Sequence, residues 1–346
     1  MAPASTPTIA GLGSTPIQGI PMNRKKFLAS CGIVALALMS ARTASAQSYP
    51  SRPIRLVVPF PPGGAVDFYA RVVQAALSEV LGQAVIIDNK AGASGMVGAG
   101  AVAQSQPDGY TLLLGNIASL AINVGLYPKM PYDPRKDFTP IIRTVDVNYV
   151  LVVHPSLAAK TWTELVQLAK AAPGKIAYGS AGSGSLPHLG TELLKAQAGV
   201  DMVHVPYKGG GPMVADLLSG QIQVVLGDQA NLMPHVQTGK LRAVAVATSK
   251  RSVNSPGLPT LAESGLSGFE ATAWQGLVGP AGMSADLVKK INDAFSQVMA
   301  MPAVRDKLLA GGLEPIGGSA QQFGRFIDSE ISKWTKIVKD VGAKAE

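Results

Sequence analysis

The sequence predicts an α/β protein in which short apolar strands alternate with amphipathic helices. Two observations support this fold class. After the first strand-like run, Tyr69, Val73 and Val80 recur at helical spacing, and Gly82 ends the helix. Four apolar runs are bounded by Gly, Pro or Asn, as strands covered on both faces are: IRLVVPF, AVIIDN, YTLLLGN and YVLVVHP. This alternation favours mostly parallel sheets.

The same alternation continues along the chain. Helical spacing recurs over 161–171, 186–198 and 211–219. Strand-like runs lie between and after these helices: KIAYGS, MVHVPY, IQVVLGD and LRAVAVAT. Beyond Trp274 the pattern predicts three helices and little strand, the helices covering 285–299, 302–310 and 320–341.

This distribution predicts two lobes. We expect the chain to leave the first lobe near Val147 and to return to it near Trp274. Lobe 1 would then contain 47–147 plus 274–346, and lobe 2 would contain 148–273. Trp274 itself either packs at this junction or forms an aromatic wall of a cleft.

The first 46 residues are predicted to lie outside the fold. A basic head, an apolar run over 27–39 and the small-residue site Ala44-Ser45-Ala46 occur in the order of a secretory signal peptide. The signal would begin near Met22 and be cleaved after Ala46. Its Arg24-Lys25 pair leaves open whether export follows the general secretory or the twin-arginine route.

Composition excludes several classes of function. Cleavage would remove the single cysteine, so no disulfide or thiol chemistry is expected. It would also remove four basic residues, lowering the net charge from +8 to +4. This modest excess, with few aromatic residues, does not predict nucleic-acid binding. No later stretch is long and apolar enough to predict a transmembrane helix.

Three glycine-rich turns follow predicted strands, where ligands of open α/β sheets bind. They are PFPPGGAVD at 59–67, YGSAGSGSLPHLG at 178–190 and VPYKGGGP at 205–212. Each precedes a predicted helix, so backbone N–H groups and the helix dipole favour an anion there. A single such turn is also explained by glycines that supply a positive φ.

The turns lack the spacing of phosphate and nucleophile motifs. None contains G-x-x-x-x-G-K-[ST] or G-x-G-x-x-G. Ser180, Ser183 and Ser185 lack glycine at both −2 and +2, which a nucleophile elbow requires. His, Cys and carboxylate spacings indicate no metal site. We therefore predict no catalytic residue, metal or cofactor.

A carboxylate fits these turns better, because backbone N–H groups and serine hydroxyls can donate to both of its oxygens. Three side chains near these turns can each be interpreted in two ways. Asp67 either helps to form the site or stabilises the start of a helix. His188 either polarises a ligand oxygen or bonds to neighbouring backbone. Asp228 either faces the cleft, where it would accept an ammonium or hydroxyl group, or caps the next helix.

Several long motifs in order resemble one family, the Bug-type or TctC-like substrate-binding proteins of tripartite tricarboxylate transport systems. The resemblance covers nearly all of the chain after the signal. It rests on YPSRPIRLVVPFPPGGAVDFYAR, LYPKMPYDPRKDFTPI, YGSAGSGSLPHL, VPYKGGGPMVADLLSGQ and LPTLAESGLSGFEATAW.

The resemblance implies a type II periplasmic binding protein whose two lobes close on a small carboxylate like a Venus flytrap. One carboxylate would be gripped by two turns, mainly through backbone N–H groups and water. The implied ligand-binding residues are Phe60, Gly63, Gly64, Asp67, Asn116, Ile117, Ala118, Ser180, Gly182, Gly184, Ser185, His188, Tyr207 and Asp228. Val66 stands where relatives commonly have Thr, which removes a hydroxyl beside the first turn.

The resemblance also implies partners. The protein would be a periplasmic monomer that delivers an organic acid anion to membrane permease subunits or to a sensor kinase. Dicarboxylates, amino acids and aromatic acids all remain candidates, because they share the carboxylate end. The alternative is an α/β hydrolase-like enzyme acting on a carboxylic ester or amide.

Overall fold

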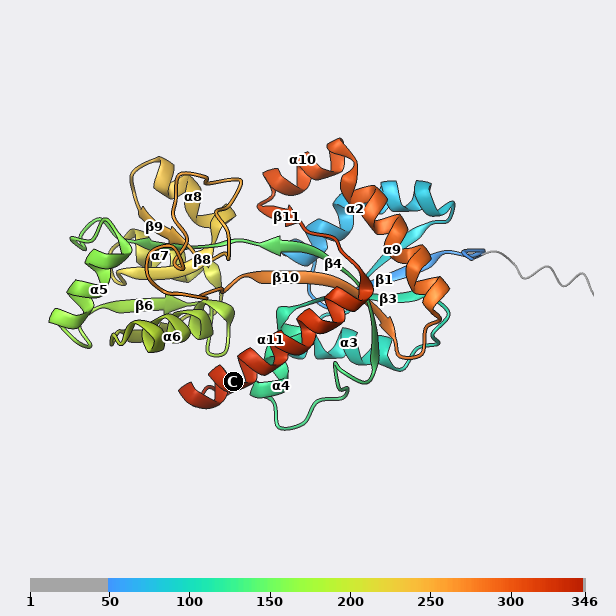
Figure 1. Cartoon of the computed structure of the whole chain (residues 1–346), viewed down its shortest axis with the longest axis horizontal. Helices are drawn as coiled ribbons and strands as arrows, with labels where there is room; N and C mark the ends of the chain where they lie inside the picture. The colour runs from blue at the N-terminus through green and yellow to red at the C-terminus, as the bar shows by residue number, and fades with distance from the viewer. Residues whose placement is uncertain (1–48, 345–346) are drawn as a thin grey trace, which may run out of the picture. The chain divides into compact units, whose positions relative to one another are not determined.

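A computed structural model of the chain describes residues 49–344 (Figure 1). The predicted signal peptide and its cleavage site after Ala46 lie outside these residues. Within them, the strands form two separate sheets, one of six strands and one of five.

The six-stranded sheet combines the start of the chain with later segments. Its order is β11-β4-β10-β3-β1-β2. The strands are β1 (Ile54–Val58), β2 (Val85–Asn89), β3 (Thr111–Asn116), β4 (Phe138–Val147), β10 (Ala273–Pro280) and β11 (Leu313–Pro315).

The five-stranded sheet is built from the middle of the chain, in the order β7-β6-β8-β5-β9. Its strands are β5 (Tyr149–Val153), β6 (Ala177–Ser180), β7 (Val203–Pro206), β8 (Val224–Asp228) and β9 (Arg242–Val246).

The expectation of mostly parallel sheets was wrong, because both sheets are mixed. β1 pairs in parallel with β2 and β3, as β6 does with β7 and β8. However, β10 is antiparallel to both β3 and β4, and β5 is antiparallel to β8 and β9. The prediction of little strand after Trp274 is confirmed, since only the rest of β10 and the short β11 follow it, but β10 is a central strand of the sheet. Residue pattern does not reveal these antiparallel partners, because they are distant in the sequence.

Helices cover both faces of the sheets (Figure 1). On the six-stranded sheet, α2 (Ala65–Leu81), α9 (Ala285–Ala300) and α10 (Pro302–Ala310) share one apolar core. α3 (Met96–Ala103), the π-helical turn η2 (Ala118–Ile122) and α11 (Ala320–Val341) belong to a second core. The remaining helices are η1 (Ala93–Gly95), α4 (Asn123–Leu126), α5 (Trp162–Ala171), α6 (Leu186–Ala198), α7 (Gly210–Leu218) and α8 (Gln229–Gln237).

Two strands connect the sheets. β4 passes through Asn148 directly into β5, and the chain returns into β10, where Ala273 pairs with Val147. Asn148 is buried, and its amide donates to Glu314 (2.8 Å) and Ser252 (3.1 Å). The connection is therefore a hydrogen-bonded crossing rather than a loose linker.

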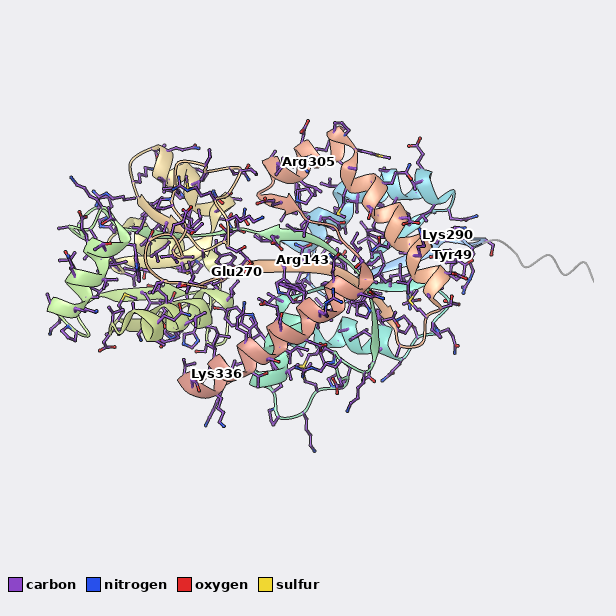
Figure 2. The ribbon with its side chains drawn as sticks, in the orientation of Figure 1. Tyr49, Arg143, Glu270, Lys290, Arg305 and Lys336 are labelled. Atoms are coloured by element: carbon purple, nitrogen blue, oxygen red, sulfur yellow. The ribbon has the colours of Figure 1, made fainter. Side chains whose placement is uncertain are left out.

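An ion pair between Arg143 and Asp146 lies on β4, the first of the two connecting strands. Figure 2 labels Arg143 there, and it labels Glu270 just before β10. Arg143 donates to both carboxylate oxygens of Asp146, at 2.9 and 2.6 Å, and its guanidinium lies 3.7 Å from the centre of the Phe326 ring. Burial raises the pKa of Asp146 to about 6, although the Arg143 charge opposes this shift.

Helix α11 is attached to β10 through a buried carboxylate. Glu330 accepts a hydrogen bond from the indole N–H of Trp274 at 2.8 Å and from that of Trp334 at 2.9 Å. It also pairs with Lys333. Trp274 therefore packs at the junction, where its ring contacts Phe323 and Phe326 edge-on. It also lines a cavity beside this junction, so both of its interpretations hold.

The turn between β1 and α2 is fixed by Asp67, which is only 2% exposed. Its carboxylate accepts from the backbone N–H of Gly63 (2.9 Å), from Asn89 (3.0 Å) and from Arg71 (2.8 and 3.0 Å). These bonds, chiefly the one from Arg71, lower the pKa of Asp67 to about 2 against the opposing effect of burial. Gly63 has φ of +91°, which glycine adopts without strain.

Replacing Glu330 by alanine should lower the free energy of unfolding by roughly 3 kcal/mol or more, because two buried indole N–H groups lose their acceptor. Asp328→Ala on the same helix is the control, since its pair with Arg135 is exposed. That variant should lose less than about 1 kcal/mol in chemical denaturation. Similar losses in both variants would contradict this role for Glu330.

Asp67→Asn should destabilise the protein by about 2 kcal/mol at pH 7. Because the folded pKa of Asp67 is lowered, its contribution is complete above about pH 4 and disappears as the pH falls toward 2. Denaturation curves of wild type and variant should therefore converge over this range. Asp293→Asn, which removes an exposed pair with Lys289, should change stability little at either pH. A constant gap between wild type and Asp67→Asn would argue against the assignment.

Candidate functional site

Two adjoining cavities form a cleft at the crossing between the sheets. The serine-turn cavity, of about 480 Å³, includes Ala181, Gly182, Ser183, Gly184, Ser185, Leu186 and Pro187 in its wall. The proline-turn cavity, of about 450 Å³, includes Pro61, Pro62, Gly64, Ala65 and Val66. Both cavities share Phe60, Asn116, Tyr149 and Ala273, so we treat them as one cleft. Such a position, at strand ends, is where α/β proteins bind ligands.

The structure brings nine of the fourteen predicted residues to the cleft wall. They are Phe60, Gly64, Asn116, Ile117, Ala118, Gly182, Gly184, Ser185 and Asp228. The other five do not line either cavity: Gly63, Asp67, Ser180, His188 and Tyr207. Four of these five, Gly63, Asp67, Ser180 and His188, nevertheless form hydrogen bonds within the turns that line the cleft.

The serine turn, residues 181–185 between β6 and α6, is shaped by internal hydrogen bonds. The hydroxyls of Ser180 and Ser185 both donate to the carbonyl of Gly182, at 3.1 and 2.7 Å. Gly182 and Gly184 have φ of +125° and +77°, values that β-carbon-bearing residues rarely adopt. A β-carbon on Gly184 would also lie 2.8 Å from a methyl of Leu126. Glycine is thus required at position 184 on two grounds.

His188 supports this turn from behind. Its Nδ1 accepts a hydrogen bond from the backbone N–H of Gly184 at 3.0 Å, so this nitrogen carries no proton. The ring stacks on His204 with centroids 4.0 Å apart, and His204 stacks on Tyr178 at 5.0 Å. Burial, with a smaller effect of Lys195, lowers the pKa of His188, whereas Glu192 raises it. The imidazole is therefore held neutral, and it bonds to backbone as one of its two interpretations predicted.

Helices α2 and α6 both begin at the cleft. Their N-caps, Gly64 and Ser185, line it, and neither provides a side-chain hydrogen bond to its helix. A helix N-terminus has unpaired backbone N–H groups and a partial positive charge. The cleft thus has an anion-attracting helix end from each sheet's set of helices.

Charged side chains add little to the electrostatic potential that the helix ends create in the cleft. No Lys, Arg or His is among the described residues that line the two cavities, and Asp228 is the single Asp or Glu among them. Asp228 accepts from the backbone N–H of Ala230 at 2.8 Å, which caps α8. Burial raises its pKa, while its bonds from Ala230 and Asn231 lower it. Both interpretations of Asp228 hold: it caps a helix and it borders the cleft.

Tyr207 is directed to another partner. Its hydroxyl donates to Asp216 at 2.8 Å, and burial, together with Asp216, raises its pKa to about 12. Its ring lies 3.4 Å from where a β-carbon on Gly179 would stand, so it packs behind β6.

Sequence reasoning missed several polar residues of the cleft: Ser94, Asn123, Tyr127, Tyr149 and Gln275. Tyr149 pairs directly with Asp228 across β5 and β8. Burial and the charge of Asp228 raise the pKa of its phenol. The signal for Gln275 was available, because it is a polar residue within an otherwise apolar strand. The others lie at the ends of short elements, in η1, at α4 and at the start of β5, which tertiary packing brings to the cleft.

Catalytic and metal chemistry find little support in this geometry. The hydroxyl of Ser180 lies 2.6 Å from Nε2 of His204, but Ser180 is fully buried and lines neither cavity. Within residues 49–344 no group of three His, Cys, Asp or Glu side chains could hold a metal ion. Over the same residues, no helix is both long and apolar enough to cross a membrane.

Comparison with known proteins identifies relatives over almost the whole chain. BugT of Bordetella pertussis (strain Tohama I) is 38% identical over 324 residues, covering 93% of this chain and 99% of BugT. A protein from the gbd 5' region of Cupriavidus necator is 38% identical over 332 residues, covering 94% of this chain and all of that protein.

Solved structures agree. Rpa4515 of R. palustris with adipate has a TM-score of 0.73 at 38% identity, covering 86% of this chain and 99% of that one. MatC of Rhodopseudomonas palustris with bound malate has a TM-score of 0.69 at 32% identity, covering 84% and 100%.

The family model described as tripartite tricarboxylate transporter family receptor matches residues 69–343. This match covers the whole five-stranded sheet and most of the six-stranded one, beginning within α2 after β1 and the turn that follows it. The chain therefore belongs to the tripartite tricarboxylate transporter receptor family and is a periplasmic-type solute-binding protein.

Proposed function

We propose that this protein captures a small organic acid anion in the cleft and delivers it to the membrane permease subunits of a tripartite transporter or to a sensor kinase. One observation carries the proposal. The N-termini of α2 and α6 both lie at the cleft, and no cationic side chain among the described residues lines it. Backbone N–H groups can hold a carboxylate without a buried cation. The adipate and malate named for Rpa4515 and MatC agree with this ligand class.

The mechanism we propose is closure of two lobes. The six-stranded and five-stranded sheets would be the cores of lobes 47–147 plus 274–346 and 148–273. An anion that contacts both helix ends would favour a closed state, which the membrane partner then recognises. We place this function in the periplasm, with residues 1–46 containing a signal peptide cleaved after Ala46.

A panel of carboxylic acids tests the proposal. At least one acid should raise the melting temperature in a concentration-dependent way, because a ligand that binds only the folded state stabilises it. Chromatography of the incubated acid, and of the matching esters and amides, should show no turnover. Conversion of an ester or amide would instead support the hydrolase alternative.

Gly184→Val should reduce affinity for the bound acid at least about a hundredfold. The substitution forces valine into a left-handed conformation and against Leu126, which displaces the serine turn. Gly199→Val is the matched control, because Gly199 also has a positive φ (+62°) but has open space around it and lies outside the cleft. Calorimetry should show near-normal affinity for the folded control. Unchanged affinity in Gly184→Val would remove the serine turn from the site.

Binding should also weaken in acid, because protonated His188 cannot accept from Gly184. Since the pKa of His188 is lowered, this loss occurs at a pH below the ordinary histidine value of 6.5. Asn keeps an acceptor but does not titrate, so His188→Asn should show a flatter affinity profile between pH 7 and 5. Equal profiles in the two proteins would contradict this role of His188.

A further inference from the structure

We propose that Gln275 selects the ligand by receiving a neutral hydrogen-bonding group, a hydroxyl or a primary carboxamide, at the end remote from the gripped carboxylate. This inference rests on the proposed function and specifies the substrate class of the same cleft. It assigns the serine turn to the carboxylate and the proline-turn cavity to the remote end.

The first argument is the state of the Gln275 side chain. It is 2% exposed and lines the proline-turn cavity. Neither its amide oxygen nor its amide nitrogen has a hydrogen-bond partner among residues 49–344. Leaving such a buried group unpaired costs about 1–3 kcal/mol, so proteins rarely keep one without a use. Tyr69 and Thr144 also have unpaired buried hydroxyls, but neither lines the cleft.

The second argument is the place of Gln275 in the sheet. It lies on the central strand β10, where the neighbouring positions Leu277 and Val278 belong to apolar cores. Its direct cross-strand partner on β3 is Asn116, which lines both cavities. Side chains of directly paired residues stand on the same face, about 5 Å apart. Two amide side chains therefore meet where the two cavities join.

The third argument is the local charge. Asp228 places a carboxylate on the same cavity, where it accepts from the backbone N–H of Ala230 at 2.8 Å. Burial raises its pKa, and the bonds from the N–H groups that it caps oppose this shift. A second carboxylate would face this negative charge without any lining cation to offset it. An ammonium group would pair with Asp228 but would leave the N–H groups of Gln275 unpaired. A hydroxyl or carboxamide both donates and accepts, and so satisfies both residues.

Calorimetry with wild-type protein tests the ligand preference directly. At each of several chain lengths, three acids are compared: the unsubstituted alkanoate, the ω-hydroxy acid and the dicarboxylate. The ω-hydroxy acid of the best length should bind at least about tenfold more tightly than the other two, since each good hydrogen bond contributes on that order. A dicarboxylate that binds as tightly, or an alkanoate that does, overturns the inference. If no acid of any class binds, the proposed function itself fails.

Gln275→Met then tests the residue. Its melting temperature without ligand should equal or exceed that of wild type, because an unpaired amide has been removed, and the tenfold preference should fall to about twofold or less. Gln223→Met is the matched control, because that amide is already paired, accepting from Ala177 (3.0 Å) and donating to Gly220 (3.1 Å). The control should melt at a lower temperature and keep the preference. A persisting preference in Gln275→Met, or its failure to fold, overturns the assignment.

Discussion

The anion that we propose must be held at a cleft that no cationic side chain lines among residues 49–344, and this constraint explains much of the structure around it. Backbone N–H groups would replace the missing charge, but they act only if the helix ends are held in a fixed orientation. α2 and α6 provide these ends, one packed on each sheet. A site that relies on backbone N–H groups avoids the cost of burying an unpaired lysine or arginine, which would be several kcal/mol.

Fixed orientation is provided by side chains that stand outside the cleft. Asp67 holds the proline turn through bonds to Gly63 and Asn89. His188 holds the serine turn through its bond from Gly184. Both residues belong to the predicted ligand-binding set, yet neither lines the cleft, and each bonds to the backbone of a turn that does. Positioning of this type reduces the reorganisation needed when a ligand binds.

Gln275 lowers the stability of the folded protein but gives the cleft a hydrogen-bonding group for a ligand. Gln275 interrupts an apolar strand, and an apolar residue there would pack without an unpaired amide. Trp274, next to it, satisfies its polar atom internally through Glu330. Both residues line the proline-turn cavity, but the indole N–H of Trp274 serves the attachment of α11 whereas the amide of Gln275 has no partner among residues 49–344.

The sequence alone predicted the α/β class, the family and nine of the residues that line the cleft. Strand and helix periodicity depend on local neighbours, and glycine turns such as 59–67 have a strong local signal. Tertiary structure alone decided that β10 runs antiparallel between β3 and β4, and that Tyr149 and Gln275 meet Asn116 and Asp228 at the cleft. It also decided that Asp67 and His188 support the turns. These outcomes depend on contacts between segments that are far apart in the chain, and residue pattern along one segment carries no record of its distant partner.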